Sequence, residues 1–305
     1  MKPTILITGG TGLVGQALSA LFVSQGYDVA HLSRNPQNSD KRSFYWNQEK
    51  GEIDSQAIEY ADVIIHLAGE NISNRKWTSH QKKRIISSRV QTTNLLERAI
   101  KSASGKPKAF ISASAIGYYG SITSDKIFTE EDPSGTDFLT ETVVKWEESV
   151  KQIQVLSIPT AILRIGVVMS RQGGALPKML QPIKWGMGAA LGNGKQWMPW
   201  IALEDLTRMF LFVLEQKLLA TSSKDLLIYN AVSIDNINNK ELMRQMAKAI
   251  KRPFFLPPVP SFLFKFIFGE MATLLLNGSR VSSEKIISEG FVFKFTKVQD
   301  LFEKV

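Results

Sequence analysis

The stretch that most constrains the fold runs from residue 4 to residue 34 and reads as a strand, a glycine-rich turn, a helix and a second strand. Residues 5–7 form an apolar run, which is typical of a strand buried on both faces of a parallel sheet. The turn that follows contains glycines three residues apart, at Gly9, Gly12 and Gly15. This order of elements predicts the first βαβ unit of an open α/β sheet.

Each of these glycines has a physical use in a turn that binds a dinucleotide. Gly9 allows a sharp turn out of the strand, Gly12 lets the backbone approach a pyrophosphate, and Gly15 lets the helix pack close to the sheet. Backbone N–H groups at the start of the helix would then face the phosphates. A glycine triplet alone also fits a turn without a ligand. Here the strand before it, and the helix and strand after it, favour dinucleotide binding.

The composition is that of an ordinary globular protein, with 305 residues and 44% hydrophobic residues. The chain has no cysteine, which excludes disulfides, thiolate catalysis and cysteine-held metal clusters. The first strand begins almost at once and leaves no room for a signal peptide. The apolar stretch 261–276 contains Lys265 and Glu270, and it is shorter than the roughly 20 residues of a helix that spans a membrane. We therefore expect a soluble, cytoplasmic protein without a membrane span.

The formal net charge is +9 at pH 7, and its distribution argues against nucleic acid as the main partner. Basic residues are dispersed, with only short clusters such as 82–84, and no DNA- or RNA-binding motif accompanies them. A solvated basic surface, with some arginines available for phosphate groups, explains the charge more simply. An RNA-associated protein on the same scaffold is the least favoured alternative.

Strands and helices alternate along most of the chain, which predicts a doubly wound parallel sheet. The expected strands are 28–33, 44–46, 63–67, 109–114, 160–169 and 226–232, and the expected helices are 55–61, 84–102, 140–152, 175–185, 204–216 and 239–251. His66 lies inside one of these strands, which favours a core histidine over a catalytic one. The glycines between 186 and 194 form a loop suited to closing over a ligand.

Several motifs, taken together, resemble one family. The chain contains, in order, TGGTGLVG, LSRNP, HLAGENI, SASAIGYYG, VVKWEE, RIGVVMSRQGGALPKM and GNGKQWMPWIALEDL. This series is similar to that of the atypical short-chain dehydrogenase/reductase family 39U, and the similarity spans essentially the whole chain. The resemblance implies NADP(H) on a Rossmann-type fold, with residues 1–169 completed by 201–235, and a smaller lobe from 170–200 and 236–305 at the substrate side. It does not supply a substrate or an oligomeric state.

The resemblance also assigns cofactor-binding residues, position by position. They are Gly9, Gly10, Thr11, Gly12, Leu13, Val14 and Gly15 in the turn, Ser33 and Arg34 after the second strand, Leu67, Ala68, Gly69 and Glu70 after the next one, Arg89 on a helix, and Val167 near the nicotinamide. No metal site is expected.

Cofactor choice depends on the end of the second strand. NAD-specific folds place an Asp or Glu there, whereas this chain has Ser33 and Arg34. A guanidinium can pair with a 2′-phosphate, which a carboxylate would repel. The sequence therefore predicts a preference for NADP(H), with a surface arginine as the alternative reading.

The candidate catalytic residues depart from the pattern of the superfamily at one position. The superfamily uses a serine and a Tyr-x-x-x-Lys pair, in which the tyrosine is the acid/base. Ser114 and Lys145 stand at the serine and lysine places, but Glu141 stands where the tyrosine belongs. Tyr118 and Tyr119 could supply a phenol instead, or could be a packed aromatic pair. Two functions stay open: an oxidoreductase or epimerase of unknown small substrate, and a non-catalytic NADP(H)-binding protein that senses redox state or binds a partner.

Overall fold

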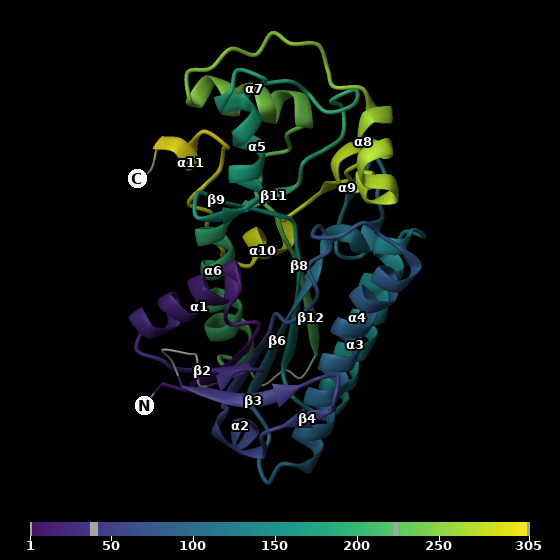
Figure 1. Cartoon of the computed structure of the whole chain (residues 1–305). Helices are drawn as coiled ribbons and strands as arrows, with labels where there is room; N and C mark the ends of the chain where they lie inside the picture. Colours follow the sequence, from purple (N-terminus) through teal and green to yellow (C-terminus); the bar gives the residue numbers. More distant parts are fainter. Residues whose placement is uncertain (1, 37–41, 222–224, 304–305) are drawn as a thin grey trace.

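The computed structural model describes residues 2–36, 42–221 and 225–303 and centres on an eight-stranded sheet (Figure 1). Its strand order is β12-β8-β6-β5-β1-β2-β3-β4, and every pairing is parallel except that of β3 with β4. The strands are β1 (Thr4–Thr8), β2 (Asp28–Ser33), β3 (Ser43–Asn47), β4 (Glu52–Ile53), β5 (Val63–His66), β6 (Ala109–Ala115), β8 (Thr160–Ile165) and β12 (Leu226–Ala231). The chain moves outward in opposite directions from β1 and β5, so the topological switch point lies between them, where ligands bind in such sheets.

Helices cover both faces of this sheet, as a doubly wound fold requires. On one face lie α1 (Leu13–Ser24) and α6 (Leu203–Phe212), and on the other lie α2 (Ser55–Tyr60), α3 (Ser79–Ser102) and α4 (Phe138–Val155) (Figure 1). The predicted fold class is confirmed. Helix α3 starts five residues earlier than predicted because the Thr78 side chain caps it, accepting a hydrogen bond from the N–H of Gln81 at 3.2 Å. No helix of the described residues is long and apolar enough to cross a membrane.

The predicted strand 160–169 is in fact two strands that belong to different sheets. Its second half is β9 (Val167–Ser170), which pairs with β10 (Gly173–Gly174) and β11 (Trp200–Ala202) in a three-stranded sheet. The chain changes sheets at Gly166, whose N–H bonds to the carbonyl of Ala231 at 3.0 Å. A Cβ at Gly166 would lie 2.5 Å from the carbonyl oxygen of Pro199, so only glycine fits this crossing.

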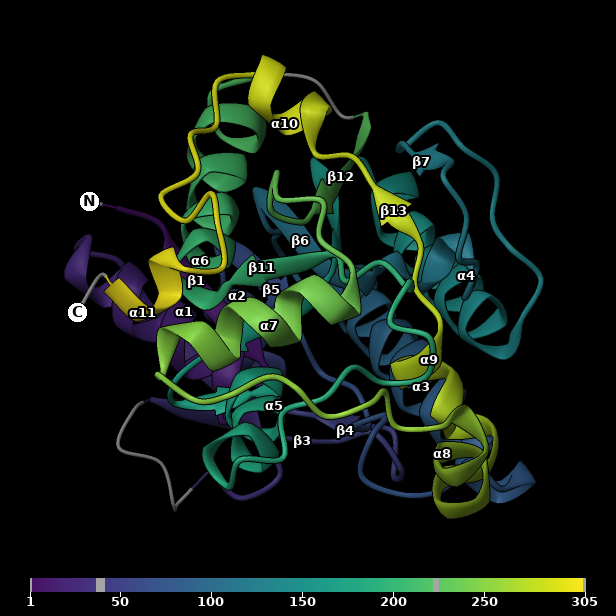
Figure 2. The ribbon, with the colours of Figure 1, turned by 90° about the horizontal axis from the view of Figure 1, so that it is seen from above.

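A smaller lobe stands on the carboxyl edge of the large sheet (Figures 1 and 2). It contains the three-stranded sheet together with α5 (Ala175–Lys184), α7 (Asn239–Ala249), α8 (Ser261–Phe268), η4 (Gly269–Ala272), α9 (Thr273–Leu276) and α11 (Asp300–Glu303). The lobe has its own apolar core, in which Trp200, Leu242 and Met246 are fully buried. The domain limits expected from the sequence, 1–169 with 201–235 and 170–200 with 236–305, stay a prediction.

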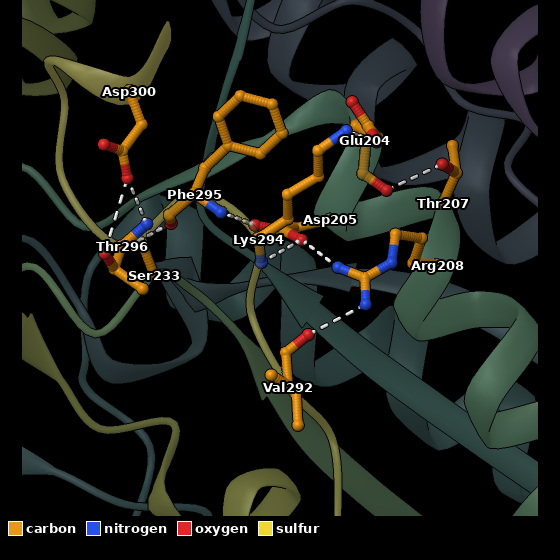
Figure 3. A network of polar contacts seen from close by, with 10 residues as sticks. All are labelled: Glu204, Asp205, Thr207, Arg208, Ser233, Val292, Lys294, Phe295, Thr296 and Asp300. Carbon is orange, nitrogen blue, oxygen red and sulfur yellow. Dashed lines mark hydrogen bonds and ion pairs between the residues drawn. The ribbon is translucent and has the colours of Figure 1, made fainter. Parts of the chain in front are cut away.

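The C-terminal tail returns to the large sheet and is anchored at the start of α6 (Figure 3). The buried carboxylate of Asp205 accepts the backbone N–H groups of Lys294 and Phe295 at 2.9 and 2.8 Å. Arg208, which pairs with Asp205 at 2.6 Å, donates to the carbonyl of Val292 at 3.0 Å. The tail also contributes β13 (Arg280–Val281), which pairs with β7 (Ile127–Phe128), and α10 (Glu284–Ser288).

Candidate functional site

A cavity of about 560 Å³ lies where β1, β2 and β5 end, at the switch point of the sheet. Ten of the residues predicted to bind the cofactor line it: Gly9, Gly10, Thr11, Gly12, Ser33, Arg34, Leu67, Ala68, Gly69 and Glu70. The same wall includes residues that the sequence analysis did not identify, namely His31, Leu32, Asn35, Ser43, Trp46, Gln48, Ser88 and Thr92. We call this space the first cavity.

The glycine turn is shaped by close contacts that side chains would prevent. Gly9 has a φ of +69°, and a Cβ on Gly15 would lie 2.4 Å from the Gly9 carbonyl oxygen. A Cβ on Gly10 would lie 2.6 Å from the ring of His31. Gly12 is different, since its Cβ would meet only the Gly9 oxygen, at 3.3 Å. The fold itself thus needs the other three glycines, and Gly12 leaves open space on the cavity side.

The N-terminus of α1 opens beside this turn. No side chain caps this end among the described residues, and the first turn contains no acidic residue. The first backbone N–H groups of a helix have no intrahelical partner and carry partial positive charge. Leu13 and Val14 contribute such N–H groups but point elsewhere: the Leu13 side chain lies against Gly173, and Val14 packs on the core. The structure therefore offers an anion site made of backbone, which fits a pyrophosphate.

Arg34 and Ser33 line the first cavity where β2 ends. Arg34 is exposed, and the hydroxyl of Ser33 accepts the N–H of Asn35 at 3.1 Å. Glu70 is the acidic residue in the wall, and its carboxylate lies 3.6 Å from the guanidinium of Arg84. An exposed guanidinium beside two polar residues suits a phosphate group.

His66 lies in β5, is completely buried and does not line the first cavity. Its ring nitrogens lie 2.8 Å from the Thr8 hydroxyl and 3.1 Å from the Thr93 hydroxyl. Complete burial, with a smaller effect from Arg89, lowers the pKa of His66 from 6.5 to about 3, so the ring is neutral. The prediction of a core histidine is confirmed.

A second cavity, of about 310 Å³, lies between the ends of β6 and β8, helix α4 and the lobe. Arg89 lines it and also lies beside Gly69 of the first cavity. A Cβ added to Gly69 would lie 3.2 Å from the guanidinium carbon of Arg89. Val167 lines the second cavity as well, and its predicted position near the nicotinamide stays a prediction. Further walls come from Ile72, Ala115–Gly117, Gly120, Ser121, Leu139, Thr142, Val143, Trp146, Ile165, Gly166, Trp197–Pro199, Thr273, Leu274 and Asn277–Ser279.

Arg89 is the charged side chain in the wall of the second cavity. It donates to the carbonyls of Ile85 and Glu70 at 2.9 and 3.1 Å, and its guanidinium carbon lies 5.2 Å from the centre of the Trp146 ring. Burial lowers the pKa of Arg89 from 12.5 to about 10, which leaves it protonated at neutral pH. It can orient a polar or anionic group but is no proton donor at pH 7.

Ser114 faces away from the second cavity and into a buried ion pair. Its hydroxyl donates to the carboxylate of Glu147 at 2.6 Å, and Arg164 binds both oxygens of that carboxylate at 2.9 Å. Ser114, Glu147 and Arg164 are at most 4% exposed. Although burial opposes the charge, hydrogen bonding to Glu147 raises the pKa of Arg164 above its usual range. In strand β6, alternate residues face opposite sides, so Ala115 and not Ser114 lines the second cavity.

Tyr118 and Tyr119 belong to the same buried network. The fully buried Tyr119 hydroxyl donates to Asn230 at 2.7 Å and accepts from Arg164 at 3.0 Å. The ring of Tyr118 lies under Arg164, with 3.4 Å between the guanidinium carbon and the ring centre. The two rings pack edge to face at 5.4 Å. This arrangement is the packed aromatic pair that the sequence analysis left as an alternative.

Lys145 and Glu141 lie on the outer side of α4. They form an ion pair at 2.6 Å, with side chains 49% and 53% exposed, and they border a groove shared with α3. The face of α4 toward the second cavity carries Leu139, Thr142, Val143 and Trp146. Thr142 and Trp146 have the four-residue spacing of Tyr-x-x-x-Lys. The structure thus brings the predicted cofactor residues together and keeps the predicted catalytic ones out of the second cavity.

Comparisons with known proteins agree with this architecture. The model of the NAD dependent epimerase/dehydratase family matches residues 5–230, and a domain of unknown function, DUF1731, matches residues 259–305. The epimerase family protein YfhF of Bacillus subtilis is 35% identical over 298 residues, covering 97% of this chain and 95% of that protein. The human epimerase family protein SDR39U1 is 32% identical over 299 residues, covering 96% of each chain.

Solved structures also agree with this architecture. The crystal structure of human SDR39U1 (isoform 2) with NADPH superposes with a TM-score of 0.84 at 29% identity, covering 99% of this chain and 100% of that one. UDP-glucuronic acid 4-epimerase from Bacillus cereus, solved with UDP-glucuronic acid and NAD, reaches 0.76 at 17% identity, covering 98% and 96%, and so shares the fold. The chain therefore belongs to the NAD dependent epimerase/dehydratase family, and its predicted place among the 39U proteins, with their C-terminal DUF1731 region, is confirmed.

Proposed function

We propose that this protein binds NADP(H), with the adenosine half in the first cavity and the nicotinamide toward the second. The observation that carries the proposal is the glycine turn, where Gly12 leaves open space beside the uncapped start of α1, in a cavity whose wall also contains Arg34. In this arrangement the turn holds the pyrophosphate and Arg34 pairs with the 2′-phosphate. The human relative crystallised with NADPH supports the same choice of cofactor.

We further propose that the reaction, in a cytoplasmic protein, is a hydride transfer to or from a small substrate in the second cavity. The bound cofactor would donate or accept the hydride. Arg89 orients the substrate, and apolar walls that include Val143, Trp146 and Leu274 contact its apolar part. Thr142 and Trp146 occupy the face where a Tyr–Lys pair would stand, so the accompanying proton comes from water.

This lining argues for oxidoreduction over nucleotide-sugar epimerisation. A nucleoside-diphosphate sugar carries two phosphate charges, which proteins usually bind with several cationic or N–H donors. Arg89, the charged residue of the wall, already donates to two carbonyls. Proton abstraction from a sugar also needs a base, which the described wall does not offer. We therefore expect a small, mostly apolar substrate.

A second candidate function is that of a non-catalytic NADP(H)-binding protein. The observation that favours it is the burial of Ser114 and Tyr119 in the Arg164 network, which removes the usual acid/base groups from the second cavity. Such a protein would report the NADPH/NADP⁺ ratio or present a surface to a partner.

The two functions can be separated by one set of measurements. Fluorescence titration with NADPH and NADH gives the affinity and the preference, and NADPH oxidation is then followed with a panel of small aldehydes, ketones and enones, and with UDP-glucose. Turnover with an apolar carbonyl supports the oxidoreductase. Tight NADPH binding without any turnover supports the sensor, and failure to bind either cofactor contradicts both.

A further inference from the structure

Helix α8 and the segments beside it expose several large apolar side chains. We call this set the apolar ridge; it consists of Trp185, Met187, Phe255, Leu256, Phe262, Leu263, Phe266 and Ile267, each between 36% and 86% exposed. No residue of α8 is buried, although six of its eight residues are apolar. A helix that is apolar on nearly all sides normally buries one of them, and exposed patches of this kind mark interaction sites.

Two segments of the lobe that carry residues of the ridge run side by side toward α8 (Figure 2). A Cβ on Gly188 would lie 3.1 Å from the Pro253 carbonyl oxygen, and the N–H of Val259 donates to Ala190 at 2.8 Å. The N–H of Gly192 donates back to Val259 at 2.9 Å. The residues after α5 therefore lie next to those before α8, so the exposed side chains of both segments belong to one part of the lobe.

The stretches of sequence that contain the apolar ridge carry a positive net charge. Residues 171–203 and 242–269 contain no aspartate or glutamate, and Glu204, Glu241 and Glu270 lie just outside them. Their basic residues are Arg171, Lys178, Lys184, Lys195, Arg244, Lys248, Lys251, Arg252 and Lys265. An ion pair of 2.6 Å between Lys82 and Glu270 also joins η4, which directly follows α8, to the start of α3, where Arg75, Lys76 and Lys83 add positive charge.

We infer that the apolar ridge docks this protein on the surface of a bilayer that contains anionic phospholipids. Phe262 and Phe266 would enter the acyl boundary to a depth of about 5–10 Å, while Lys265 and its basic neighbours contact the headgroups. Eight residues of helix extend only about 12 Å, so α8 lies in the interface and does not span it. A second copy of the chain is a poorer occupant, because it would bring the same positive charge to the contact.

The direct test is co-sedimentation of the full-length protein with vesicles of phosphatidylcholine, alone or with phosphatidylserine. We expect binding to the vesicles that contain phosphatidylserine, little binding to phosphatidylcholine alone, and weaker binding as salt rises, because salt screens the attraction. Equal binding to both vesicle types would contradict the role of the basic residues.

Two sets of variants assign the binding to this surface. Phe262→Ser with Phe266→Ser should reduce the partition coefficient about tenfold or more, because two inserted aromatic side chains are lost. The matched control, Val155→Ser with Val292→Ser, removes equally exposed side chains outside the ridge and should bind as the parent does. Replacing Lys184, Lys251, Arg252 and Lys265 with Gln should weaken binding about fivefold per charge to anionic vesicles only.

All of these positions are exposed, so circular dichroism and thermal unfolding should match the parent protein. Vesicle binding that survives the Phe262→Ser/Phe266→Ser change would overturn the proposal. So would an absence of vesicle binding together with a concentration-dependent dimer that the same change dissolves, since the ridge would then be a contact between copies.

Discussion

The two cavities lie side by side on one edge of the sheet, but they are built from different chemistry. The first is made of backbone and small polar groups: glycines, a helix N-terminus, Ser33 and Arg34. The second is lined by Trp146, Val143, Leu274 and other apolar side chains, with Arg89 as its charge. The first suits an anionic ligand held by fixed donors, and the second suits a small, mostly apolar ligand with a group that Arg89 can orient. The difference separates the proposed cofactor binding from proton transfer, for which the described wall of the second cavity offers no acid/base side chain.

The largest expected effect concerns the buried pair that removes Ser114 from the second cavity. Arg164→Met would leave the carboxylate of Glu147 buried without its cation, which typically costs about 3–5 kcal/mol of the free energy of unfolding. Urea denaturation measures the loss. Arg244→Met is the matched control, because Arg244 pairs with Glu241 at 3.2 Å on the surface and should change stability by at most about 0.5 kcal/mol. Equal, small losses would mean that the pair does not hold this region.

The next effect tests the first cavity. Gly12→Val should weaken NADPH binding by roughly a hundredfold or more, since an isopropyl group would fill the space that the pyrophosphate needs. The fold should survive, because Cβ at Gly12 meets only one atom, at 3.3 Å. Gly105→Val is the control, since Gly105 is exposed with nothing within 4 Å of its Cβ, and NADPH affinity should stay unchanged there. A folded Gly12→Val protein with normal affinity would refute the assignment of the turn.

A pH dependence should arise from His66, which is completely buried in β5. Its pKa is depressed to about 3, so the stability it contributes is complete above pH 6.5 and is lost as the pH falls from 6.5 toward 3. The free energy of unfolding should drop by about 1.4 kcal/mol per pH unit in that range through this group, or about 2 kcal/mol at pH 5. His66→Asn should be less stable at pH 7 and lack this part of the slope. Parallel pH curves for the two proteins would contradict the depressed pKa.

Cofactor choice gives a smaller effect. Arg34→Ala should weaken NADPH about tenfold, because a charge-assisted contact with the 2′-phosphate is lost, and leave NADH nearly unchanged. Fluorescence titration with both cofactors measures this. Arg75→Ala removes a basic residue outside the first cavity and serves as the control. Equal losses for NADPH and NADH would place Arg34 away from the 2′-phosphate.

The smallest effect is expected at Lys145. Lys145→Ala should change the free energy of unfolding by no more than about 0.5 kcal/mol, because the pair with Glu141 is exposed, and should leave NADPH affinity and any turnover unchanged. Trp146→Phe, one residue along the helix but facing the second cavity, should alter turnover more. A Lys145→Ala protein with impaired turnover would show that the outer face of α4 takes part in catalysis.

The sequence predicted the first cavity well and the second poorly, for a physical reason. The glycine turn depends on local backbone geometry, and residues 9–12, 33–34 and 67–70 follow three strands whose ends meet at one edge. The second cavity depends on which way side chains face: Ser114 against Ala115 in a strand, and Lys145 against Trp146 in a helix. The motifs identify residue types, but they do not show which face of a strand or helix a side chain occupies. Alternation in β6 and the apolar periodicity of α4 contained the missing signal.

The anchoring of the C-terminal tail has a consequence for how this chain can change over evolution. Two family models divide the sequence at residues 230 and 259, as if the tail were a module added to a complete domain. Yet Phe291 and Phe293 are buried in the core formed with α1 and α6, and Asp205 holds backbone groups 89 and 90 residues further on. The tail therefore cannot be exchanged without the region that it packs against. A recombination that exchanged it alone would leave a carboxylate and an apolar face without partners, so both regions have to be inherited together.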